Sequence, residues 1–555
     1  MAETIRVQLN TAEAQLPCGV TVGEAVRALL PGDAFQAVLG VMRSGECLEL
    51  TQPLHQDCAL IPLTYREEEG RRIYERSLRF VFLAAMKRLY PEKQVRILNS
   101  VGHGLYARLK GDTLTNRQVE AVEQEMRRLV EGDLPFEKEQ WSREEAVEYF
   151  TAQGRLDKAE LLRYRPSRQM TMYRMGGLCE YFYGAMLPST GWVKVFRLKP
   201  HFPGLVIMSP APDAPEVPAP YESHAKFLRV FGQSQEWCNI LGANNAVDVN
   251  RMVQDGKMRE FIRVNEALQD KSIAAIADEI VHRGARIIMI FGPSSSGKTT
   301  TANRLAVHLR VLGKKPRLIS LDDFYRNRAD LPLEADGTPD LEHVEALDLP
   351  LLSSCLEGLL GGEEVEMPLF DFSVARRKPE GWKLRIAEDE PLIVEGIHGM
   401  NPRITAALPE QLMYGVYVSA LSCINLDDHN RIRTTDVRLL RRIVRDVRMR
   451  NTSPRETIAM WPKVRAGEEK WIFPFQERAD AMFNTSLHYE LPILKSMAYE
   501  LLLSITKDEP EYLVAHRLLK TLHYFLPADG KIMSEVPPLS ILREFVGECS
   551  FYDIH

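Results

Sequence analysis

The spacing of apolar residues near the N-terminus predicts a small domain of mixed strands and helix. Residues 5–9 alternate apolar and polar side chains, as a half-buried strand does. Thr21 and Glu24 have the spacing of a capping box, and an apolar helical pattern follows them. A second strand is predicted over 38–42, with a turn at Ser44 and Gly45. The order of strand, helix and short strands fills the first 65 residues or so.

The middle of the chain changes character twice. The run PAPDAPEVPAP over 210–220 is rich in proline and predicts a linker without regular structure. Residues 221–282 then have helical spacing, with an apolar stripe at 274, 276, 277 and 280. This pattern predicts a mainly helical connector, and no residue in it indicates chemistry.

A continuous apolar run over 286–291 is typical of a strand buried in a parallel sheet, and a helical pattern follows the loop after it. The loop GPSSSGKTT has the glycine spacing with which backbone N–H groups surround phosphate oxygens. In this motif the lysine reaches the β- and γ-phosphates and the next hydroxyl holds magnesium. We therefore predict ATP and Mg²⁺ as cofactors, and we assign nucleotide binding to Gly292, Pro293, Ser294, Ser295, Ser296, Gly297, Lys298, Thr299 and Thr300.

Carboxylates follow two further predicted strands, PRLISLDDFY at 316–325 and PLIVEGIHG at 391–399. The carboxyl ends of parallel strands converge on the ligand crevice of an open sheet. Asp322, Asp323 and Glu395 are therefore expected to face the terminal phosphate. One carboxylate would accept the proton of an attacking hydroxyl, and another would steady magnesium.

The stretch 431–455 holds nine arginines and two aspartates, and an apolar stripe runs through its predicted helix at 440, 443, 444 and 447. We interpret it as a lid whose arginines contact phosphate or ribose. A solvated basic helix or an RNA-binding face is the alternative. Beyond it, 479–484 is strand-like, and the last fifty residues predict a helical tail packed on this domain or on a second subunit.

Composition limits the class of protein. The 555 residues correspond to three or four domains at about 150 residues each. Hydrophobic residues make up 45% and charged residues 26%, as in globular proteins, and 70 basic against 76 acidic side chains do not fit a chain that mainly coats nucleic acid. The eight cysteines form no CxxC pair, and no apolar run approaches a membrane span. A cytoplasmic enzyme, associated as a homo-oligomer and without membrane contact, is expected.

The motifs GPSSSGKTT, LDDFY, GGEEVEMPLFDFSVARR, VEGIHG and RRIVRD occur in the order found in the uridine kinase family, relatives of phosphoribulokinase, which the chain resembles over about 285–485. The resemblance implies a P-loop kinase and gives each matching residue a role. Asp322 matches the base and Lys298 its catalytic partner; Thr299 and Glu395 match the magnesium site; Arg445 and Arg450 match triphosphate contacts; Asp340, Glu342, Phe370, Asp371, Phe372, Arg377 and Arg442 match the substrate site.

The chain departs from the family where the acceptor base would bind. The family segment PxYDFxxHxR reads PLFDFSVARR here, so Phe370 and Ala375 replace a tyrosine and a histidine. A phenyl ring has no hydroxyl and alanine has no donor or acceptor, and losing polar contacts removes discrimination. Phosphoryl transfer is therefore better supported than uridine as the acceptor, and another alcohol stays open.

The N-terminal segments FVFLAAMKRLYPEK, GLYARL, 118–150 and LPSTG occur in the order of the editing domain of threonyl-tRNA synthetase, after a part that resembles a TGS domain. The family's editing site uses an HxxxH pair and a later Cys and His. Arg76 and Phe80 stand at the first pair and Met186 at the last His, while Cys179 is displaced by three residues. These side chains cannot form that site, so we expect a retained scaffold without editing activity.

Together these patterns predict an α/β P-loop kinase domain, a parallel sheet flanked by helices, behind an α+β TGS-like domain and an α+β synthetase-like domain. The leading function is an ATP-dependent nucleoside kinase, with a nucleoside or similar small alcohol as substrate. The alternative is a tRNA- or ribosome-associated regulator that uses the P-loop as a switch. The predicted domains are 1–67 (TGS-like), 68–210 (editing-like, degenerate), 211–282 (linker and connector), 283–500 (kinase) and 501–555 (tail).

Overall fold

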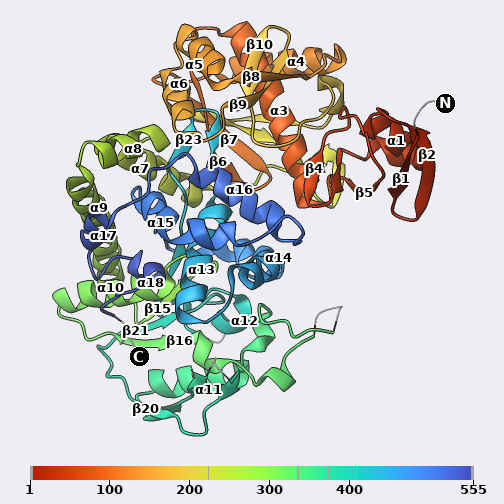
Figure 1. Cartoon of the computed structure of the whole chain (residues 1–555). Helices are drawn as coiled ribbons and strands as arrows, with labels where there is room; N and C mark the ends of the chain where they lie inside the picture. The colour runs from red at the N-terminus through yellow and green to blue at the C-terminus, as the bar shows by residue number, and fades with distance from the viewer. Residues whose placement is uncertain (1–3, 223, 334–336, 372–373, 407, 552–555) are drawn as a thin grey trace.

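The computed structural model describes the whole chain except residues 1–3, 223, 334–336, 372–373, 407 and 552–555. Figure 1 shows the N-terminal sheet at one side, a second α+β part beside it, and the parallel sheet at the opposite end of the molecule. The C-terminal helices lie between these parts.

The N-terminal part is a five-stranded sheet in the order β2-β1-β5-β3-β4, with β1 and β5 parallel. The predicted capping box is present: the Thr21 hydroxyl accepts from the Glu24 N–H at 3.2 Å, and the Glu24 carboxylate accepts from the Thr21 N–H at 2.9 Å. Ile5, Val7 and Leu9 face the core, as their alternation predicts. The elements are β1 (Thr4–Leu9), β2 (Ala12–Pro17), α1 (Val22–Leu29), α2 (Gly32–Gln36), β3 (Gly40–Arg43), β4 (Glu46–Leu48) and β5 (Cys58–Leu63).

The next part is built around the long helix α3 (Glu68–Leu89), most of whose side chains are buried. Two antiparallel sheets accompany it, in the orders β11-β12-β7-β6 and β10-β9-β8. Their elements are β6 (Val95–Val101), β7 (Gly104–Leu109), α4 (Asn116–Glu131), β8 (Glu137–Ser142), α5 (Arg143–Ala152), α6 (Leu156–Arg163), β9 (Gln169–Met175), β10 (Leu178–Tyr181), β11 (Arg197–His201) and β12 (Gly204–Met208).

The prediction that 210–220 has no regular structure is wrong. These residues form a two-stranded ribbon of β13 (Pro210–Ala211) and β14 (Ala214–Pro218). Proline lacks an N–H but is tolerated in strands with a free edge, and both strands of an isolated ribbon have one. The predicted helical connector is confirmed, as α7 (Ala225–Leu241), α8 (Ala246–Gln254) and α9 (Met258–Arg283).

The predicted kinase fold is confirmed by a five-stranded parallel sheet in the order β16-β21-β15-β22-β25. Its central strand β15 is buried along its whole length and alternates its faces: Ile288 and Ile290 pack with α9 and α10, and Met289 and Phe291 pack with α11. The elements are β15 (Ile287–Phe291), α10 (Lys298–Val311), β16 (Arg317–Ser320), α11 (Leu349–Leu360), β21 (Leu392–Glu395), α12 (Pro402–Thr405), β22 (Met413–Ser419), α13 (Thr434–Met449), α14 (Pro454–Trp471) and β25 (Ala481–Asn484).

Short ribbons extend from this domain: β17 (Val365–Met367) with β20 (Trp382–Leu384), β18 (Phe370–Asp371) with β19 (Arg376–Arg377), and β23 (Asn425–Asp427) with β24 (Asn430–Arg431). The C-terminal helices are α15 (Glu490–Leu503), α16 (Tyr512–Leu522), α17 (Gly530–Ser534) and α18 (Arg543–Val546). The tail packs on the kinase domain, one of the two arrangements expected, and α15 runs across the predicted boundary at 500.

The β23–β24 ribbon joins the kinase domain to the synthetase-like part, and Figure 1 shows β23 beside β6 and β7. The Ile97 N–H donates to the Asp428 carbonyl at 2.8 Å, and the Asn425 amide donates to the Ile97 carbonyl at 2.7 Å. Lys158, which is fully buried, forms an ion pair with Glu180 and lies 3.6 Å from Asp427. Buried ionic contacts of this kind fix the two parts against each other, since separating them would leave charges unpaired.

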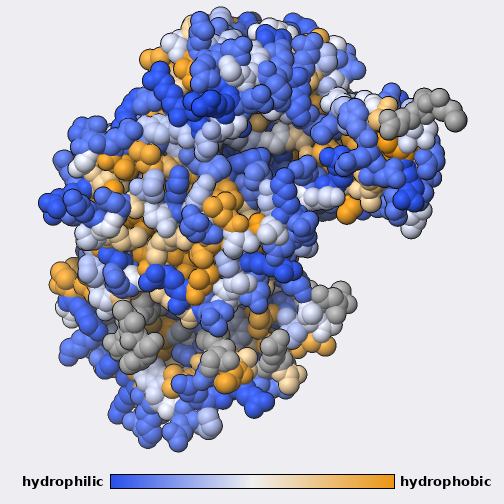
Figure 2. Space-filling model, in the orientation of Figure 1, coloured by the Kyte–Doolittle hydropathy of each residue, from blue (hydrophilic) through white to orange (hydrophobic). Residues whose placement is uncertain are grey.

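Hydrophilic side chains cover most of the face shown in Figure 2, and apolar ones gather in its middle, over the C-terminal helices. Within the described residues, none of the helices has both the length and the apolar composition needed to cross a bilayer.

Candidate functional site

The loop between β15 and α10 has the backbone of a phosphate cradle. Gly292 and Gly297 have positive φ angles of 155° and 85°, and Ser295 has a φ of 58°, which is uncommon for a residue with a Cβ. A Cβ on Gly292 would lie 2.0 Å from the Val418 carbonyl oxygen of the neighbouring strand β22. Glycine is therefore required here by the close approach of the loop to β22.

The loop side chains fit a bound triphosphate. The hydroxyls of Ser295 and Ser296 are buried and have no hydrogen-bond partner among the described residues. Among the residues that the structure describes, Lys298 donates only to the Pro293 carbonyl, at 3.2 Å. Unsatisfied buried donors are costly, and phosphate oxygens are acceptors that would satisfy them. The residues present therefore fit ATP.

Thr299 and Glu395 meet at the predicted magnesium site. The Thr299 hydroxyl donates to Glu395 Oε1 at 3.3 Å, and the Ser320 hydroxyl donates to the same oxygen at 3.0 Å. Burial, together with the charge of Asp322, raises the pKa of Glu395 to about 7. Within the described residues no group of three His, Cys, Asp or Glu side chains is arranged around a metal position. One carboxylate, one hydroxyl and nucleotide phosphates are nevertheless a common set for Mg²⁺, which keeps several waters.

Asp322 stands in a short 3₁₀ turn, Leu321–Phe324, directly after β16. Its carboxylate accepts no hydrogen bond from any residue that the structure describes, while its N–H donates to the Ser320 hydroxyl at 3.2 Å. Burial raises the pKa of Asp322, and the charges of Lys298, Arg450 and Arg445 oppose that rise. A carboxylate held by its backbone, unpaired and close to a lysine is placed to accept a proton from a ligand.

Asp323, the other acid of this turn, points elsewhere. Its carboxylate accepts from the Phe370 N–H at 3.3 Å, and burial raises its pKa. It therefore anchors the β18–β19 ribbon beside Asp322. From the sequence we expect Asp323 to face the terminal phosphate as well. The hydrogen bond to Phe370 instead directs its carboxylate toward the β18–β19 ribbon.

Three of the predicted lid arginines share one buried carboxylate. Arg445 donates to Asp446 at 2.7 Å, Arg442 lies 3.2 Å from it and Arg450 lies 3.8 Å from it. Arg442 also donates to the Ser294 hydroxyl of the loop at 2.9 Å. The three guanidinium groups thus share one directly paired carboxylate, and the charge of Arg445 is the main cause that lowers the pKa of Arg450 to about 10. This group of arginines beside Ser294 suits a polyanion such as a triphosphate.

Two other arginines of this helix do not join the group at Asp446 and are held inside the protein. Arg438 and Arg441 are almost fully buried. Arg438 pairs with Glu468 and donates to the Ser294 carbonyl at 2.8 Å, and Arg441 pairs with Glu490 at 2.7 Å. A buried arginine is tolerated where carboxylate and carbonyl oxygens accept hydrogen bonds from its guanidinium. The two carboxylates that do so here belong to α14 and α15.

The acceptor side of the site contains Glu342 and Asp340. The Glu342 N–H donates to Asp340 Oδ1 at 3.0 Å. Burial and the charge of Glu468 raise the pKa of Glu342 to about 7, and Arg442 and Lys298 oppose this rise. A Cβ on Gly467 would lie 2.3 Å from the Glu342 Cβ. Because Gly467 has no side chain, α14 leaves room for Glu342 to lie near Lys298 and Arg442.

Phe370, Asp371 and Arg377 lie on the β18–β19 ribbon, and the predicted Phe372 lies outside the described residues. The Phe370 ring is 5.9 Å from the ring of Tyr325, centre to centre. Arg377 pairs with Asp348 at 3.2 Å and donates to the Tyr325 carbonyl at 3.3 Å. Arg377 is therefore held by residues of its own domain. The Phe370 ring lies beside the turn that carries Asp322.

Two acids that the sequence reasoning missed also bind the loop and the start of α10. Glu468 accepts from the Ser294 N–H at 3.1 Å, and Glu544 accepts from both the N–H and the hydroxyl of Thr300, at 3.1 and 2.7 Å. Thr300 lies in the first turn of α10, where helix N–H groups bind phosphate. The carboxylate of Glu544 therefore occupies donors that a nucleotide would use. No local motif marks either acid.

Three of the four positions of the degenerate editing site lie together beside α3, and Cys179 does not join them. Arg76 donates to the Ala185 carbonyl at 2.8 Å and pairs with Glu69 at 3.0 Å. Phe80 and Met186 are buried in the core around α3, and Cys179 belongs to a separate apolar cluster with α5 and α6. These residues pack the fold.

Comparison with known proteins agrees with both halves of the sequence interpretation. Residues 287–490 match the phosphoribulokinase/uridine kinase family, so the chain contains a domain of this family. The N-terminal region matches threonine–tRNA ligases: 34% identity over 182 residues in Desulforamulus reducens and 37% over 183 residues in Nitrosococcus oceani, in each case 32% of this chain. The chain spans about 28% of the length of these ligases.

Solved structures similar to this chain include several that are described as kinases. One, described as a possible uridine kinase from Bacillus stearothermophilus, is 19% identical with a TM-score of 0.27 and covers 39% of this chain and 98% of that chain. Another, D-glycerate 3-kinase from Cryptococcus neoformans var. grubii, is 16% identical with a TM-score of 0.23 and covers 46% of this chain and 87% of that chain. These values are too low to assign a substrate.

Proposed function

We propose that the protein is an ATP- and Mg²⁺-dependent kinase that phosphorylates the 5′-hydroxyl of a nucleoside or a similar small alcohol. One observation carries this proposal. The unpaired carboxylate of Asp322 lies within the electrostatic reach of Lys298, at the end of the strand next to the one that carries Glu395. A base, a phosphate-binding lysine and a magnesium carboxylate are the parts that phosphoryl transfer requires.

Each residue has one task in this scheme. When bound, ATP with Mg²⁺ supplies the phosphoryl group and an ADP leaving group. The acceptor oxygen forms its bond to the γ-phosphorus as the bond to the ADP oxygen breaks, and Asp322 takes the hydroxyl proton. Lys298 and the arginines held by Asp446 compensate the negative charge, and Glu395 with Thr299 holds the metal.

The acceptor would lie between Asp322, Glu342 and the Phe370 ring. Glu342 supplies carboxylate oxygens for sugar hydroxyls, and Phe370 offers a ring face for stacking. Position 375, an alanine in a left-handed conformation with φ 52°, adds no polar contact. We infer that the site binds the sugar more specifically than the base.

The test is a screen of the full-length protein with ATP and Mg²⁺ against nucleosides, sugars and small acyclic alcohols, with products identified by mass. The Lys298→Ala variant serves as the background. We expect a product about 80 Da heavier than the nucleoside, which is the mass that one transferred phosphoryl group adds. Phosphorylation of non-nucleoside alcohols alone would refute the nucleoside assignment and retain the kinase. Undiminished turnover by Lys298→Ala would refute the kinase site.

A second candidate function is RNA-associated regulation, which the similarity to threonine–tRNA ligases favours. In this scheme the N-terminal parts contact tRNA, and the P-loop domain acts as a nucleotide-dependent switch. Binding through phosphates weakens steeply with salt. Filter binding of tRNA at about 50 and about 200 mM salt tests this candidate, because binding through phosphates weakens strongly over that range. Absence of salt-sensitive binding would dispose of this candidate.

A further inference from the structure

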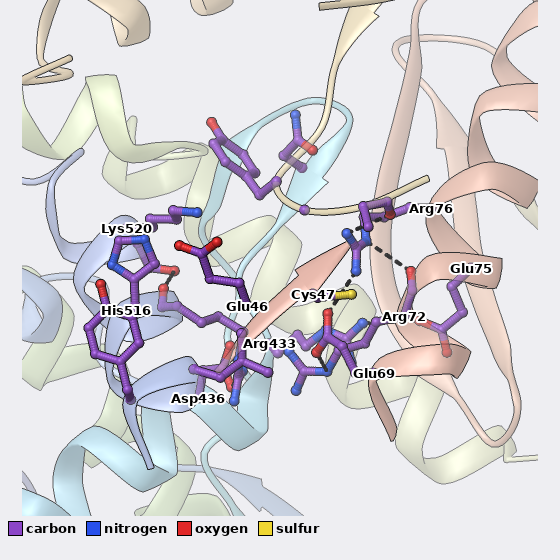
Figure 3. Close-up of a pocket in the computed structure, with 18 of the residues that line it drawn as sticks. Glu46, Cys47, Glu69, Arg72, Glu75, Arg76, Arg433, Asp436, His516 and Lys520 are labelled. Atoms are coloured by element: carbon purple, nitrogen blue, oxygen red, sulfur yellow. Dashed lines mark hydrogen bonds and ion pairs between the residues drawn. The ribbon is translucent and has the colours of Figure 1, made fainter. Parts of the chain in front are cut away.

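A cavity of about 450 Å³ lies where the N-terminal sheet, α3, the β23–β24 ribbon, α13 and α16 meet. In Figure 3, His516 and Lys520 lie across it from Arg72 and Arg76, with Glu46 and Cys47 between them. A second cavity of about 440 Å³ shares Cys47, His516 and Lys520 with it. Volumes of roughly 300–1,000 Å³ are usual for small-molecule sites. No residue assigned to the kinase site lines either cavity.

Two arginines that line this cavity have no anionic partner. Arg79, which is 9% exposed, forms no hydrogen bond or ion pair with any described residue, and its guanidinium lies 5.2 Å from the centre of the Phe182 ring. The guanidinium of Arg431, partly buried at the end of the ribbon, likewise forms no hydrogen bond or ion pair with any described residue. Buried charges without partners are costly, so a ligand that pairs with them would be strongly favoured.

Neighbouring arginines of the cavity are paired and form its frame. Arg76 binds Glu69 at 3.0 Å, Arg433 binds Glu75 at 3.2 Å, and Arg517 binds Asp436. Burial and the charges of Arg76 and Arg433 lower the pKa of Arg79 to about 10. Burial and the charges of Arg433 and Arg79 lower the pKa of Arg431 to about 9, and Glu75 opposes both shifts.

We propose that this junction cavity is a second ligand site, which binds a small phosphate-bearing molecule of about nucleotide size through Arg79 and Arg431. Guanidinium forks match phosphate oxygens in geometry and charge. The volume of about 450 Å³ fits a compact ligand rather than an extended nucleic acid. The nearly parallel rings of Tyr512 and His516, 13° apart, give an aromatic wall.

The junction cavity is separate from the P-loop. Arg433 at the start of α13 lines the cavity, and Arg442 of the same helix donates to Ser294. At 1.5 Å per residue, nine residues of helix place the two positions about 14 Å apart. Loss of one site therefore need not remove the other.

Isothermal titration of the full-length protein with inorganic pyrophosphate tests this inference. The Lys298→Ala variant weakens the P-loop, so the heat that remains reports the junction cavity. In that background we expect one site, which Arg431→Gln and Arg79→Gln each weaken at least about tenfold, the loss of roughly one charged contact. Arg117→Gln, at an exposed position of α4, is the matched control and should change nothing.

Three results would overturn the proposal. The first is that Lys298→Ala binds no pyrophosphate at all. The second is binding that persists unchanged when the partly exposed Arg431 is replaced, in a variant whose circular dichroism matches that of the wild type. The third is tRNA that binds through Arg431 in a protein that binds neither pyrophosphate nor nucleoside monophosphates. Each outcome is independent of whether the kinase reaction is found.

Discussion

Replacing Glu395 by glutamine should stabilise the protein while it weakens the magnesium site. Glu395 is 5% exposed, and its pKa rises from an ordinary 4.5 to about 7. The folded state therefore keeps a proton that the unfolded chain has released, and stability falls as pH rises from 4.5 to 7. Above pH 7 the wild type carries the full cost of a buried charge, about 3 kcal/mol from that pKa difference.

Glutamine has the same shape and still accepts from Thr299 and Ser320, but it cannot ionise. Calorimetry at pH 5 and pH 8 would measure the difference. We expect Glu395→Gln to unfold close to the wild type at pH 5 and to be more stable at pH 8. For a domain of 150–250 residues, 1 kcal/mol corresponds to roughly 2–4 °C, so the transition should rise by about 6–12 °C.

The control is Glu388→Gln, an exposed residue in the turn before β21, which should leave the transition unchanged at both pH values. Kinase turnover of Glu395→Gln should fall, because the Mg²⁺ carboxylate is lost. A stability difference that does not grow with pH, or a variant less stable than the wild type at pH 8, would refute the claim that Glu395 is protonated in the folded protein near neutrality.

Three other substitutions test separate contacts. Glu544→Gln removes the charge that occupies Thr300, so ATP should bind up to about tenfold more tightly; a dissociation constant unchanged in titration would show that Glu544 does not compete with phosphate. Gly467→Ala places a Cβ against Glu342, so kcat/KM for the acceptor should fall by about 10-fold or more while the affinity for ATP stays unchanged. An equal fall in kcat/KM and in ATP affinity would show that the substitution disturbs the whole site instead. Lys158→Met removes the buried ammonium beside Glu180 and Asp427, which then keep only hydrogen bonds such as those to His429 and Asn430, and should cost about 3–5 kcal/mol in denaturant unfolding; a stability equal to that of wild type would contradict the role given to the β23–β24 ribbon.

The kinase sheet and its loop were predictable because their signals are local. The apolar run before Gly292 and the helical pattern after Thr300 identify strand, loop and helix within a few turns of chain. The position of Glu395 followed from the rule that parallel strands end at one edge, and the model places its carboxylate 3.3 Å from the Thr299 hydroxyl. Short-range patterns of this kind need no knowledge of distant partners.

Contacts between distant segments were not predictable. Glu468 and Glu544 bind Ser294 and Thr300 from 174 and 244 residues away. Neither glutamate differs in sequence from the many acids on solvated helix faces. The burial of Arg438 has the same cause, because only the arrival of Glu468 makes it favourable.

The ribbon at 210–218 shows a limit of composition as a guide. Proline content predicts a linker, yet Pro210–Ala211 and Ala214–Pro218 pair as antiparallel strands, which a ribbon with free edges allows. The junction cavity is a similar case, since Arg79 belongs to α3 and Arg431 to the β23–β24 ribbon, 352 residues later in the chain. Their proximity is a property of the assembled fold.

The central claim is that Asp322 accepts the proton of the alcohol while the P-loop holds ATP. The most direct measurement is the rate of phosphoryl transfer by Asp322→Asn, with an acceptor found in the screen, alongside its ATP dissociation constant. The account predicts a rate lower by about 10²–10⁴-fold and an ATP affinity within about threefold of wild type, less than 1 kcal/mol. Transfer at the wild-type rate would contradict it.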